Sequence, residues 1–349
     1  MDWSGMFRAI TTDMTYRMCT NCIMDTTAKE ITFDDKGVCN FCHQARRSIE
    51  STKYLKFPKI PRGEKYDVLI GLSGGVDSSY LLHLAVHMGL RPLCFSVDNG
   101  WNDPKADENI MRMVETLKVP FYRYTIDLKK FLELQGAFMK AGVKNIEIPT
   151  DHILMAASYE LASKYGIKFI LSGGNVATES IMPASWGHNA RDLTHIKAIY
   201  RKFTGKNLKG LPLCSIWKWN WYRWIKKIKI IYVLDYFKYD RLAAIKSLEE
   251  QYGYKPYGDK HNESIFTWWF QSFYLYEKFN IDKRKAHLSS LINSGQMTRR
   301  EALVELEKSP VYPQIGLETK VLQYPKHEHE EYPMDKWYTR IARVVKCVS

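Results

Sequence analysis

The sequence Ser-Gly-Gly-Val-Asp-Ser-Ser at residues 73–79 is the segment whose residue types point most directly to chemistry. It follows the apolar run 66–72 and precedes the helix-like stretch 80–89. Adjacent glycines let backbone N–H groups approach an anion, and a helix N-terminus adds a favourable dipole. A carboxylate beside phosphates requires a bridging Mg²⁺. We therefore predict a phosphate-binding loop, whose residues would be Ser73, Gly74, Gly75, Asp77, Ser78 and Ser79.

The loop contains no lysine, so it does not match the Gly-x-x-x-x-Gly-Lys-Ser/Thr pattern of hydrolases that cut at the γ-phosphate. It resembles instead the pyrophosphate loop (PP-loop), Ser-Gly-Gly-x-Asp-Ser, of enzymes that split ATP between its α- and β-phosphates. The alternative is an ordinary glycine-rich turn between a strand and a helix. The strand-loop-helix context favours the ATP-binding interpretation.

Two further loops follow predicted strands and carry polar or glycine residues. The first is 98–101, Asp-Asn-Gly-Trp; the second is 172–175, Ser-Gly-Gly-Asn, with Glu179 shortly after it. Each by itself is also consistent with a plain turn. Because the carboxyl ends of parallel strands meet at one crevice, we expect the loops to converge. The residues added to the ATP site are Asp98, Gly173, Gly174 and Asn175.

Charged side chains gather again in segments 260–264 and 282–289. They predict a cationic substrate site with an acid/base pair, although salt bridges between packed helices use the same residue types. Aromatic residues at 266–276 have helical spacing, which is typical of core. The candidate catalytic residues are Asp77, Glu179 and Lys260, and the candidate substrate-binding residues are His261, Glu263, Ser264, Arg284 and His287.

Four cysteines form two Cys-x-x-Cys pairs, Cys19 with Cys22 and Cys39 with Cys42. Two such pairs complete a tetrahedral Cys₄ zinc site that leaves no open position for a substrate. We therefore predict a structural zinc ribbon. A redox pair, a sulfur carrier, or replacement of one ligand by His43 are the alternatives.

The elements that must position these residues alternate between strand-like and helical patterns. This alternation predicts an α/β fold with a parallel doubly wound sheet. The strands are expected at 66–72, 93–97, 120–125 and 168–171, and the helices at 78–89, 103–117, 128–141 and 150–165. We expect a zinc-ribbon segment with a linker at 1–60, an ATP pyrophosphatase domain at 61–200, and a mainly helical substrate- or partner-binding region at 201–349.

Composition narrows the class of protein without choosing a function. The 349 residues carry a formal charge of +13, which implies an acidic partner such as a nucleotide, nucleic acid or an anionic membrane face. The N-terminal residues lack the apolar run of a signal peptide, and no stretch of about 18 apolar residues predicts a transmembrane helix. Four of the seven cysteines have metal-ligand spacing and the other three are scattered, so a disulfide scaffold is not expected. We therefore expect a cytoplasmic protein.

Segment 201–229 is strongly basic, with nine lysines and arginines, no acidic residue and four tryptophans. A solvated basic face over a protein interface is our first interpretation, a membrane-facing patch the second, and nucleic acid the last.

Taken in order, the Cys₄ ribbon, the loops at 73–78 and 172–179, and the segments 260–264 and 282–287 resemble the N-acetyl sugar amidotransferases, the WbpG/PseA type of bacterial surface-polysaccharide biosynthesis. The resemblance covers about residues 18–306, although segment 201–229 does not match residue by residue. It implies a PP-loop (adenine-nucleotide alpha-hydrolase-like) enzyme that uses ATP and Mg²⁺. The implied product is an acetamidino sugar, made from a nucleotide-linked N-acetyl sugar for lipopolysaccharide O-antigen or a related glycan. Ammonia would come from a separate glutaminase subunit through a cyclase-like subunit, both similar to those of imidazole-glycerol-phosphate synthase.

The chemistry agrees with the residues. An amide carbonyl is a poor electrophile, and transfer of AMP to its oxygen supplies a good leaving group that ammonia displaces. Pyrophosphate would leave from the loop at 73–79, while Glu179 would bind a second Mg²⁺ or accept a proton from ammonia. No glutaminase nucleophile is recognisable, since residue 2 is Asp2 and no nucleophile elbow surrounds a cysteine. The alternative is a tRNA-modifying PP-loop enzyme of the thiolation type, for which only Cys94 and Cys214 offer sulfur beyond the ribbon.

Overall fold

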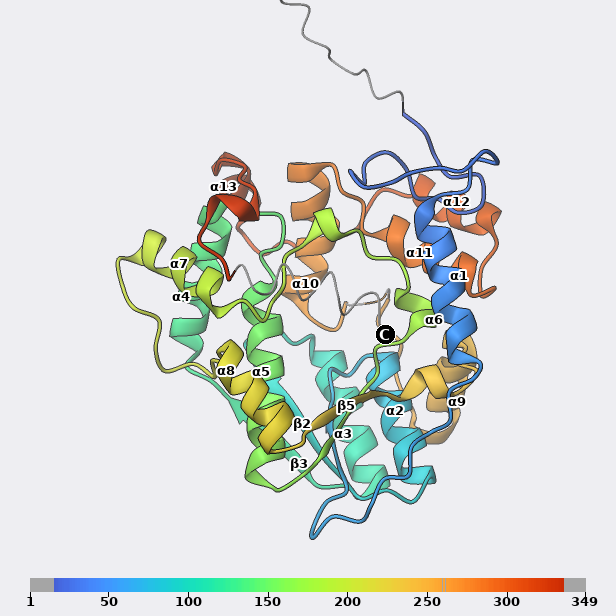
Figure 1. Ribbon diagram of the computed structural model, residues 1–349, viewed down its shortest axis with the longest axis vertical. Helices are drawn as coiled ribbons and strands as arrows, with labels where there is room; N and C mark the ends of the chain where they lie inside the picture. Colours follow the sequence, from blue (N-terminus) through green and yellow to red (C-terminus); the bar gives the residue numbers. More distant parts are fainter. Residues whose placement is uncertain (1–15, 259, 261, 336–349) are drawn as a thin grey trace, which may run out of the picture.

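A five-stranded parallel sheet forms the centre of the lower half of the molecule in Figure 1. The computed structural model describes residues 16–258, 260 and 262–335. The strand order is β3-β2-β1-β4-β5. Their bounds are β1 Val68–Gly71, β2 Pro92–Asp98, β3 Phe121–Thr125, β4 Phe169–Ser172 and β5 Lys229–Tyr232. Leu69 of β1 pairs with Leu93 on one side and with Ile170 on the other, so β1 is a central strand.

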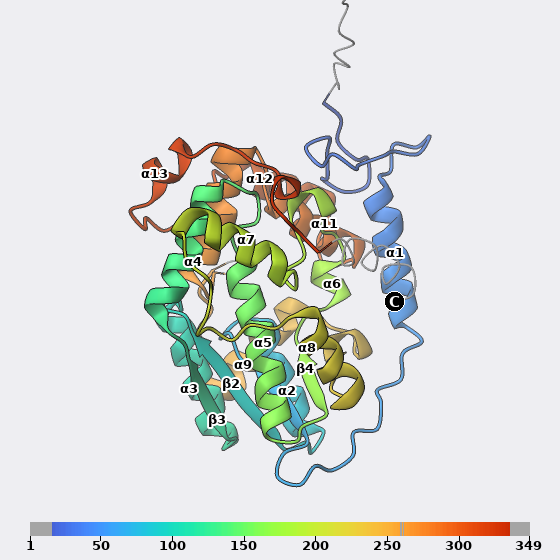
Figure 2. The ribbon, with the colours of Figure 1, turned by 60° about the vertical axis from the view of Figure 1, so that its left-hand side comes forward.

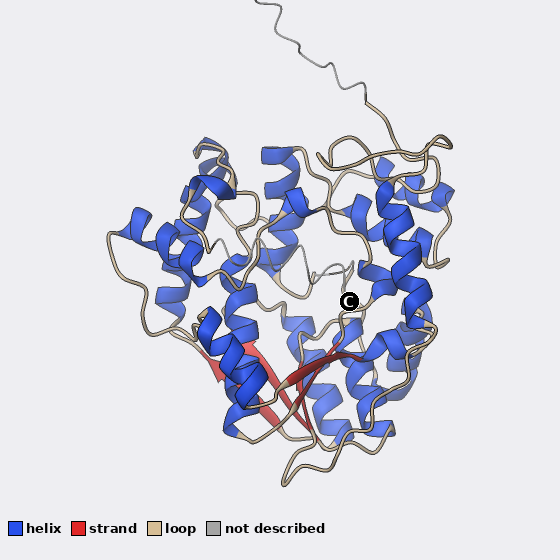
Figure 3. Ribbon diagram, viewed as in Figure 1, coloured by secondary structure: helices blue, strands red, loops and turns tan. Residues whose placement is uncertain are grey.

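Helices cover both faces of this sheet, as Figure 3 shows in blue against red. Successive side chains of a strand point to opposite faces, and the core divides accordingly. Leu69 belongs to one buried cluster with residues of α4 and α5, whereas Val68 and Ile70 belong to another with residues of α2, α3 and α9. The predicted doubly wound fold is confirmed. These helices span α2 Val76–His87, α3 Pro104–Leu117, α4 Leu128–Ala141, α5 Ile148–Lys164 and α9 Arg241–Tyr252.

The fifth strand departs from the expected organisation. We expected the ATP domain to end at residue 200, but β5 pairs in parallel with β4 and extends the sheet to Tyr232. The sequence signal is weak because the strand is four residues long and lies next to lysines and the tryptophan-rich segment. Edge strands are often this short, and length is the main signal that separates a strand from a helix segment.

The remaining helices are α1 Asn40–Thr52, α6 Val176–Glu179, α7 Leu193–Thr204, α8 Ile216–Asn220, α10 Ile265–Trp269, α11 Arg284–Asn293, α12 Arg299–Glu307 and α13 Glu318–Gln323. Of these helices, α8 packs beside α5, and most of the others lie toward the carboxyl end of the sheet. Two π-helical stretches, η2 at Trp221–Ile225 and η4 at Phe270–Lys278, continue α8 and α10. Short 3₁₀ turns lie at Ala184–Trp186, Val233–Tyr236 and His329–Glu331. None of the helices among the described residues has the length and apolar character needed to cross a bilayer.

Two local predictions for this region are confirmed. The aromatic run at 266–276 is largely core, since Phe266, Trp269 and Tyr274 are almost completely buried. Thr298 caps α12 and forms a capping box with Glu301, because each side chain bonds the other residue's backbone N–H.

A buried histidine cluster attaches the C-terminal segment to α7. His195 is fully buried, and its Nε2 lies 3.0 Å from Nδ1 of His329. The backbone N–H of Asn145 donates to Nε2 of His329, so the proton of that ring is on Nδ1, facing His195. His188 stacks on His329 and pairs with Asp192. Burial lowers the pKa of His195 to about 4, with the His188 charge acting in the same direction.

We predict that this cluster makes stability depend on pH below neutrality. The pKa of His195 is about 4 in the folded chain and 6.5 ordinarily, so the unfolded chain binds the proton first as pH falls. Stability is therefore complete above pH 6.5 and decreases toward pH 4, by roughly 3 kcal/mol for this one group. Urea unfolding between pH 7 and 4 measures it, with His195→Phe expected to flatten the pH slope. His43→Gln, at an exposed site, should leave the slope unchanged. A wild-type slope in His195→Phe would contradict the prediction.

Candidate active site

The loops after β1 and β4 meet at the centre of the sheet, where helices leave toward opposite faces. Such a reversal of strand order is where doubly wound sheets bind ligands. Gly74 has φ +80°, and a Cβ there would lie 2.2 Å from the carbonyl oxygen of Ala106. A Cβ at Gly173 would approach the backbone of Asp77 to 3.0 Å. Gly74 is therefore required by close packing against α3, whereas Gly173 lets the loop after β4 approach the loop after β1.

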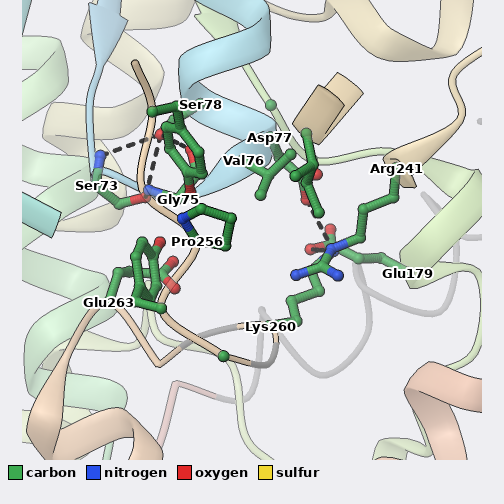
Figure 4. Close-up of a pocket in the computed structure, with 16 residues that line it drawn as sticks. Ser73, Gly75, Val76, Asp77, Ser78, Glu179, Arg241, Pro256, Lys260 and Glu263 are labelled. Carbon is green, nitrogen blue, oxygen red and sulfur yellow. Dashed lines mark hydrogen bonds and ion pairs between the residues drawn. The ribbon is translucent and has the colours of Figure 1, made fainter. Parts of the chain in front are cut away.

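A cavity of about 210 Å³ opens between these loops and segment 254–263 (Figure 4). Ser73, Ser78 and Glu263 lie on one side, and Asp77, Glu179, Arg241 and Lys260 lie on the other. Ser78 Oγ lies 3.2 Å from Ser73 Oγ and 3.3 Å from the backbone nitrogen of Ser73, so the loop is internally hydrogen-bonded. The polar residues of its wall are Ser73, Asp77, Ser78, Glu179, Arg241, Tyr254, Tyr257, Lys260 and Glu263.

Lys260 joins the two loops through ion pairs. Its Nζ lies 3.0 Å from Oδ2 of Asp77 and 2.8 Å from Oε1 of Glu179, and it donates to Oγ1 of Thr178 at 2.6 Å. Only 14% of its side chain is exposed. Burial alone would lower the pKa of Lys260, but Asp77 and Glu179 raise it above its ordinary value. The lysine is therefore a buried cation held between two carboxylates.

Further groups hold the carboxylates in place. The hydroxyl of Tyr239 donates to Oδ1 of Asp77. Asp235 accepts from the backbone N–H of Val176 at 2.8 Å, which fixes the start of α6 and so the helix that carries Glu179. The carboxyl of Glu263 is different, because burial and the Asp77 charge raise its pKa above the ordinary value. A raised pKa makes this carboxyl a better proton acceptor than an ordinary glutamate.

The donor set at Asp77 and Glu179 fits a magnesium ion. Mg²⁺ prefers one or two carboxylates together with phosphate oxygens and water. The ammonium of Lys260, bound by both carboxylates, shows that the two side chains already converge on one cation. No step below depends on the geometry of such an ion.

A second cavity, of about 470 Å³, adjoins the first and shares Lys260 and Arg241 with it. Its wall comes from α10, η4, α11 and segment 305–311. Burial lowers the pKa of Lys283 to about 8, and Lys283 lies at this wall. The wall combines cations with the rings of Trp268 and Tyr276; its basic members are Arg241, Lys260, Lys283, Arg284, His287 and Lys308.

The structure brings many, but not all, of the sequence-predicted residues to these cavities. Asp77, Ser73, Gly75, Ser78, Gly173, Gly174, Glu179, Lys260 and Glu263 line the first cavity, and Arg284 and His287 line the second. Asn175 and Ser264 instead cap α6 and α10, and Ser79 is buried in α2. Gly74 lies behind the loop against Ala106, and Asp98 bonds the backbone of Gly100 outside the cavity wall. His261 lies outside the described residues.

The position of Arg284 has a structural reason. Arg284 forms an ion pair with Asp282 at 2.7 Å and donates to the carbonyls of Glu305 and Lys308, so its guanidinium ties α11 to the end of α12. Tyr239 and Arg241 were missed by sequence reasoning. Tyr239 lies just before α9 and Arg241 is the first residue of that helix, and neither belongs to a motif. Only the fold brings Tyr239 to Asp77 and Arg241 to the cavity wall.

The four cysteines near the N-terminus form a tight buried cluster. Their Sγ atoms lie within 4.8 Å of one another, with 3.9 Å between Cys19 and Cys42 and 3.7 Å between Cys22 and Cys39. A tetrahedral site with Zn–S bonds of about 2.3 Å requires separations of about 3.8 Å. The cluster therefore fits zinc, as predicted.

This ribbon packs on α11, which carries a wall of the second cavity (Figure 2). Lys285 of α11 forms an ion pair with Asp25, whose side chain is fully buried. Asn293 donates to Sγ of Cys42, and Ser289 accepts from the backbone N–H of Ile23. On its other side, α11 contacts α6, because Oγ of Ser290 accepts from the backbone N–H of Ile181. The ribbon thus supports both α11 and the helix of Glu179.

We predict one zinc ion per chain, bound by the four ribbon cysteines. Cys42→Ser should lose most of the zinc and lower the melting temperature by at least about 5 °C, because zinc-binding free energy is folding free energy for such a segment. Elemental analysis without added metal and calorimetry measure both. Cys214→Ser, a buried cysteine outside the ribbon, should keep its zinc. Iron with visible absorbance in the wild type would contradict a zinc site.

Comparison with known proteins adds one family match. Residues 263–333 match the family model described as "LPS biosynthesis protein WbpG-like, C-terminal domain". No curated protein matches the chain. Among solved structures, an NH3-dependent NAD synthetase from Campylobacter jejuni matches with 15% identity and a TM-score of 0.28, over 47% of this chain and 71% of its own. An NMN synthetase from Francisella tularensis matches with 12% identity and a TM-score of 0.29, over 63% and 97%. TM-scores this low carry no argument. Residues 263–333 are therefore similar to a WbpG-like C-terminal domain.

Proposed function

We propose that this protein is an ATP-dependent amidotransferase that converts the acetamido group of a nucleotide-linked N-acetyl sugar into an acetamidino group. The observation that carries the proposal is the convergence of Asp77 and Glu179 on Lys260 between two glycine loops, beside a larger cationic cavity. The match to a WbpG-like domain of lipopolysaccharide biosynthesis supports a glycan precursor as substrate.

In the first step, ATP binds with its phosphates at the loop of Ser73 and Ser78. The amide oxygen of the sugar attacks the α-phosphorus, the bond between the α- and β-phosphates breaks, and pyrophosphate leaves. Backbone N–H groups, serine hydroxyls and Lys260 stabilise the charge that develops on the phosphates. Mg²⁺, held by Asp77 and Glu179, would neutralise phosphate charge during this step.

In the second step, ammonia adds to the activated carbon and AMP leaves with the former amide oxygen. The attacking nitrogen must lose a proton as the amidine forms, and Glu179, which lines the first cavity beside Lys260, is the proposed acceptor. Glu263, whose pKa burial raises, is suited to hold a proton on the opposite wall. Lys260 binds both carboxylates before ATP enters and would turn to the phosphates afterwards.

The second cavity is the proposed site of the nucleotide sugar. Its basic wall suits a diphosphate, and Trp268 and Tyr276 offer flat apolar surface to a base or sugar ring. Because the two cavities share Lys260 and Arg241, the amide of a sugar bound in the second cavity would face the phosphates of ATP in the first.

Ammonia is proposed to come from a glutaminase subunit through a cyclase-like subunit, in the cytoplasm, where nucleotide sugars are made. A tRNA thiolase needs a sulfur donor within reach of the activated base. The described cysteines outside the ribbon, Cys94 and Cys214, are both completely buried, which disfavours this alternative.

We predict that the chain, incubated with ATP, Mg²⁺, ammonium and a UDP-linked N-acetyl sugar, forms AMP and pyrophosphate in equal amounts and a sugar product about one mass unit lighter. Asp77→Ala should reduce this rate at least about 100-fold, because it removes a carboxylate that positions both Lys260 and the metal. Mass spectrometry and a pyrophosphate assay measure the reaction. Asp35→Ala, at an exposed turn of the ribbon, is the matched control. Threefold or smaller loss in Asp77→Ala, with the melt unchanged, would refute the assignment.

We also predict that ammonium at high pH supports the reaction by the isolated chain, whereas glutamine supports it only with a separate glutaminase complex. The physical reason is that NH₃, not NH₄⁺, is the nucleophile, so the ammonium-dependent rate should rise with pH. Rates with each nitrogen source, at fixed sugar and ATP, provide the test. Glutamine use by the isolated chain would contradict the proposal that a separate glutaminase supplies the ammonia.

A further inference from the structure

Helix α8 and its continuation η2 expose an unusual apolar stripe. Trp217 is 80% exposed, Trp224 67% and Ile225 67%, and Trp221 lies on the same face at 42%. Residues 217, 221, 224 and 225 have the spacing that aligns side chains along one side of a helix. Solvent gives such large apolar side chains no stabilisation, so the stripe requires an occupant.

The opposite face of the same helix explains why the stripe is held firmly outward. Trp219 and Tyr222 are buried and pack against Tyr159 of α5, behind α8 in Figure 1. The sequence predicts a basic face over a protein interface for the whole of segment 201–229, including Trp219. Trp219 is core, so that part of the expectation is corrected: two inward rings anchor the helix, and the remaining ones point away.

Basic side chains surround the stripe. Nζ of Lys226 lies 4.8 Å from the ring centre of Trp221, and the guanidinium of Arg223 lies 5.4 Å from that of Trp224. Lys218 and Lys227 are exposed beside them. No acidic residue occurs between 201 and 229. The surface thus combines several positive side chains with protruding apolar groups.

We propose that this stripe, Trp217, Trp221, Trp224 and Ile225 with its surrounding lysines and arginines, docks the protein on an anionic membrane surface. Lipid headgroups bind the cations, while tryptophan and isoleucine enter the boundary between headgroups and acyl chains. Single-stranded nucleic acid fits less well. Its bases could stack on the tryptophan rings and its phosphates could pair with the cations, but it offers no apolar partner for Ile225.

The position of the stripe separates a membrane from a glutaminase as its occupant. The end of η2 lies at the start of the parallel strands, since Lys168, just before β4, donates to the carbonyl of Lys226 at 3.0 Å. The candidate active site lies at the other end of β4, beyond Ser172. A glutaminase docked at Trp224 and Ile225, beside Lys226, would release ammonia at the end of the sheet away from the active site, whereas a membrane there leaves the active site open.

The test is sedimentation of the full chain with vesicles of phosphatidylcholine, with or without about one third phosphatidylglycerol. Binding to the anionic vesicles only, weakened by salt, is expected. Trp224→Ser with Ile225→Ser should lower the partition coefficient about tenfold, and Lys226→Gln about fivefold. The matched controls, Leu242→Ser and Lys246→Gln, change an exposed leucine and an exposed lysine of α9 and should each change it less than about twofold.

Three outcomes would overturn the proposal. Equal binding to both kinds of vesicle would exclude an anionic membrane as the occupant of the stripe. Wild-type vesicle binding by the Trp224/Ile225 variant would also exclude it. Loss of glutamine-dependent turnover in that variant, with vesicle binding unchanged, would assign the stripe to a protein partner. Retention of RNA by the wild type but not by the variant, without vesicle binding, would assign it to nucleic acid. The vesicle and RNA measurements do not depend on the proposed reaction, so failure of the membrane proposal is distinguishable from failure of the proposed function.

Discussion

The ion pairs of Lys260 with Asp77 and Glu179 are the interactions on which the candidate site depends. Two carboxylates that converge in a partly closed cavity repel each other, and each loses hydration there. A single buried ammonium offsets both penalties only because its distances to them are 3.0 and 2.8 Å, since a buried charge without such a partner is strongly destabilising. The three residues come from three separate segments, so this contact holds the two strand loops and segment 254–263 in one arrangement.

The same ion pairs make Lys260 and Glu263, on the wall of one cavity, differ in how their pKa values are shifted. Lys260 keeps its proton because the carboxylates raise its pKa, while the nearby Glu263 carboxyl has a raised pKa because burial disfavours its charge. A permanent cation and a carboxyl with a raised pKa therefore lie on the wall of one cavity. Lys260 also belongs to the wall of the second cavity, so ligands in the two cavities would share it.

Support for the second cavity comes from a distant part of the sequence. The ribbon at residues 19–42 contacts α11 through Asp25 and Lys285, and α11 contacts α6 through Ser290. A Cys₄ zinc site has no flexibility at its ligands, which makes the ribbon a rigid support rather than a reactive centre. This explains how a small N-terminal segment influences a site built by residues 178–311.

The sequence alone determined those features that reside in local pattern. Strand-helix alternation predicted the parallel sheet, the Cys-x-x-Cys spacing predicted the metal cluster, and the glycine loops predicted where the phosphates of ATP would bind. The parallel sheet and the cysteine cluster are confirmed, because strand-helix alternation and the spacing of tetrahedral ligands are set by residues close together in the sequence. Binding of the ATP phosphates at the glycine loops stays a prediction.

Only the tertiary structure decided what depends on distant segments. In the folded chain, β5 pairs with β4, and Tyr239 donates to Asp77. Arg284 forms an ion pair with Asp282, and its guanidinium links α11 to α12. It also separated Trp219, in the core, from Trp217 and Trp224 on the surface. Residue type cannot make these distinctions, because burial of a tryptophan, or the partner of a charge, depends on which elements pack beside it. That packing is a property of the whole chain.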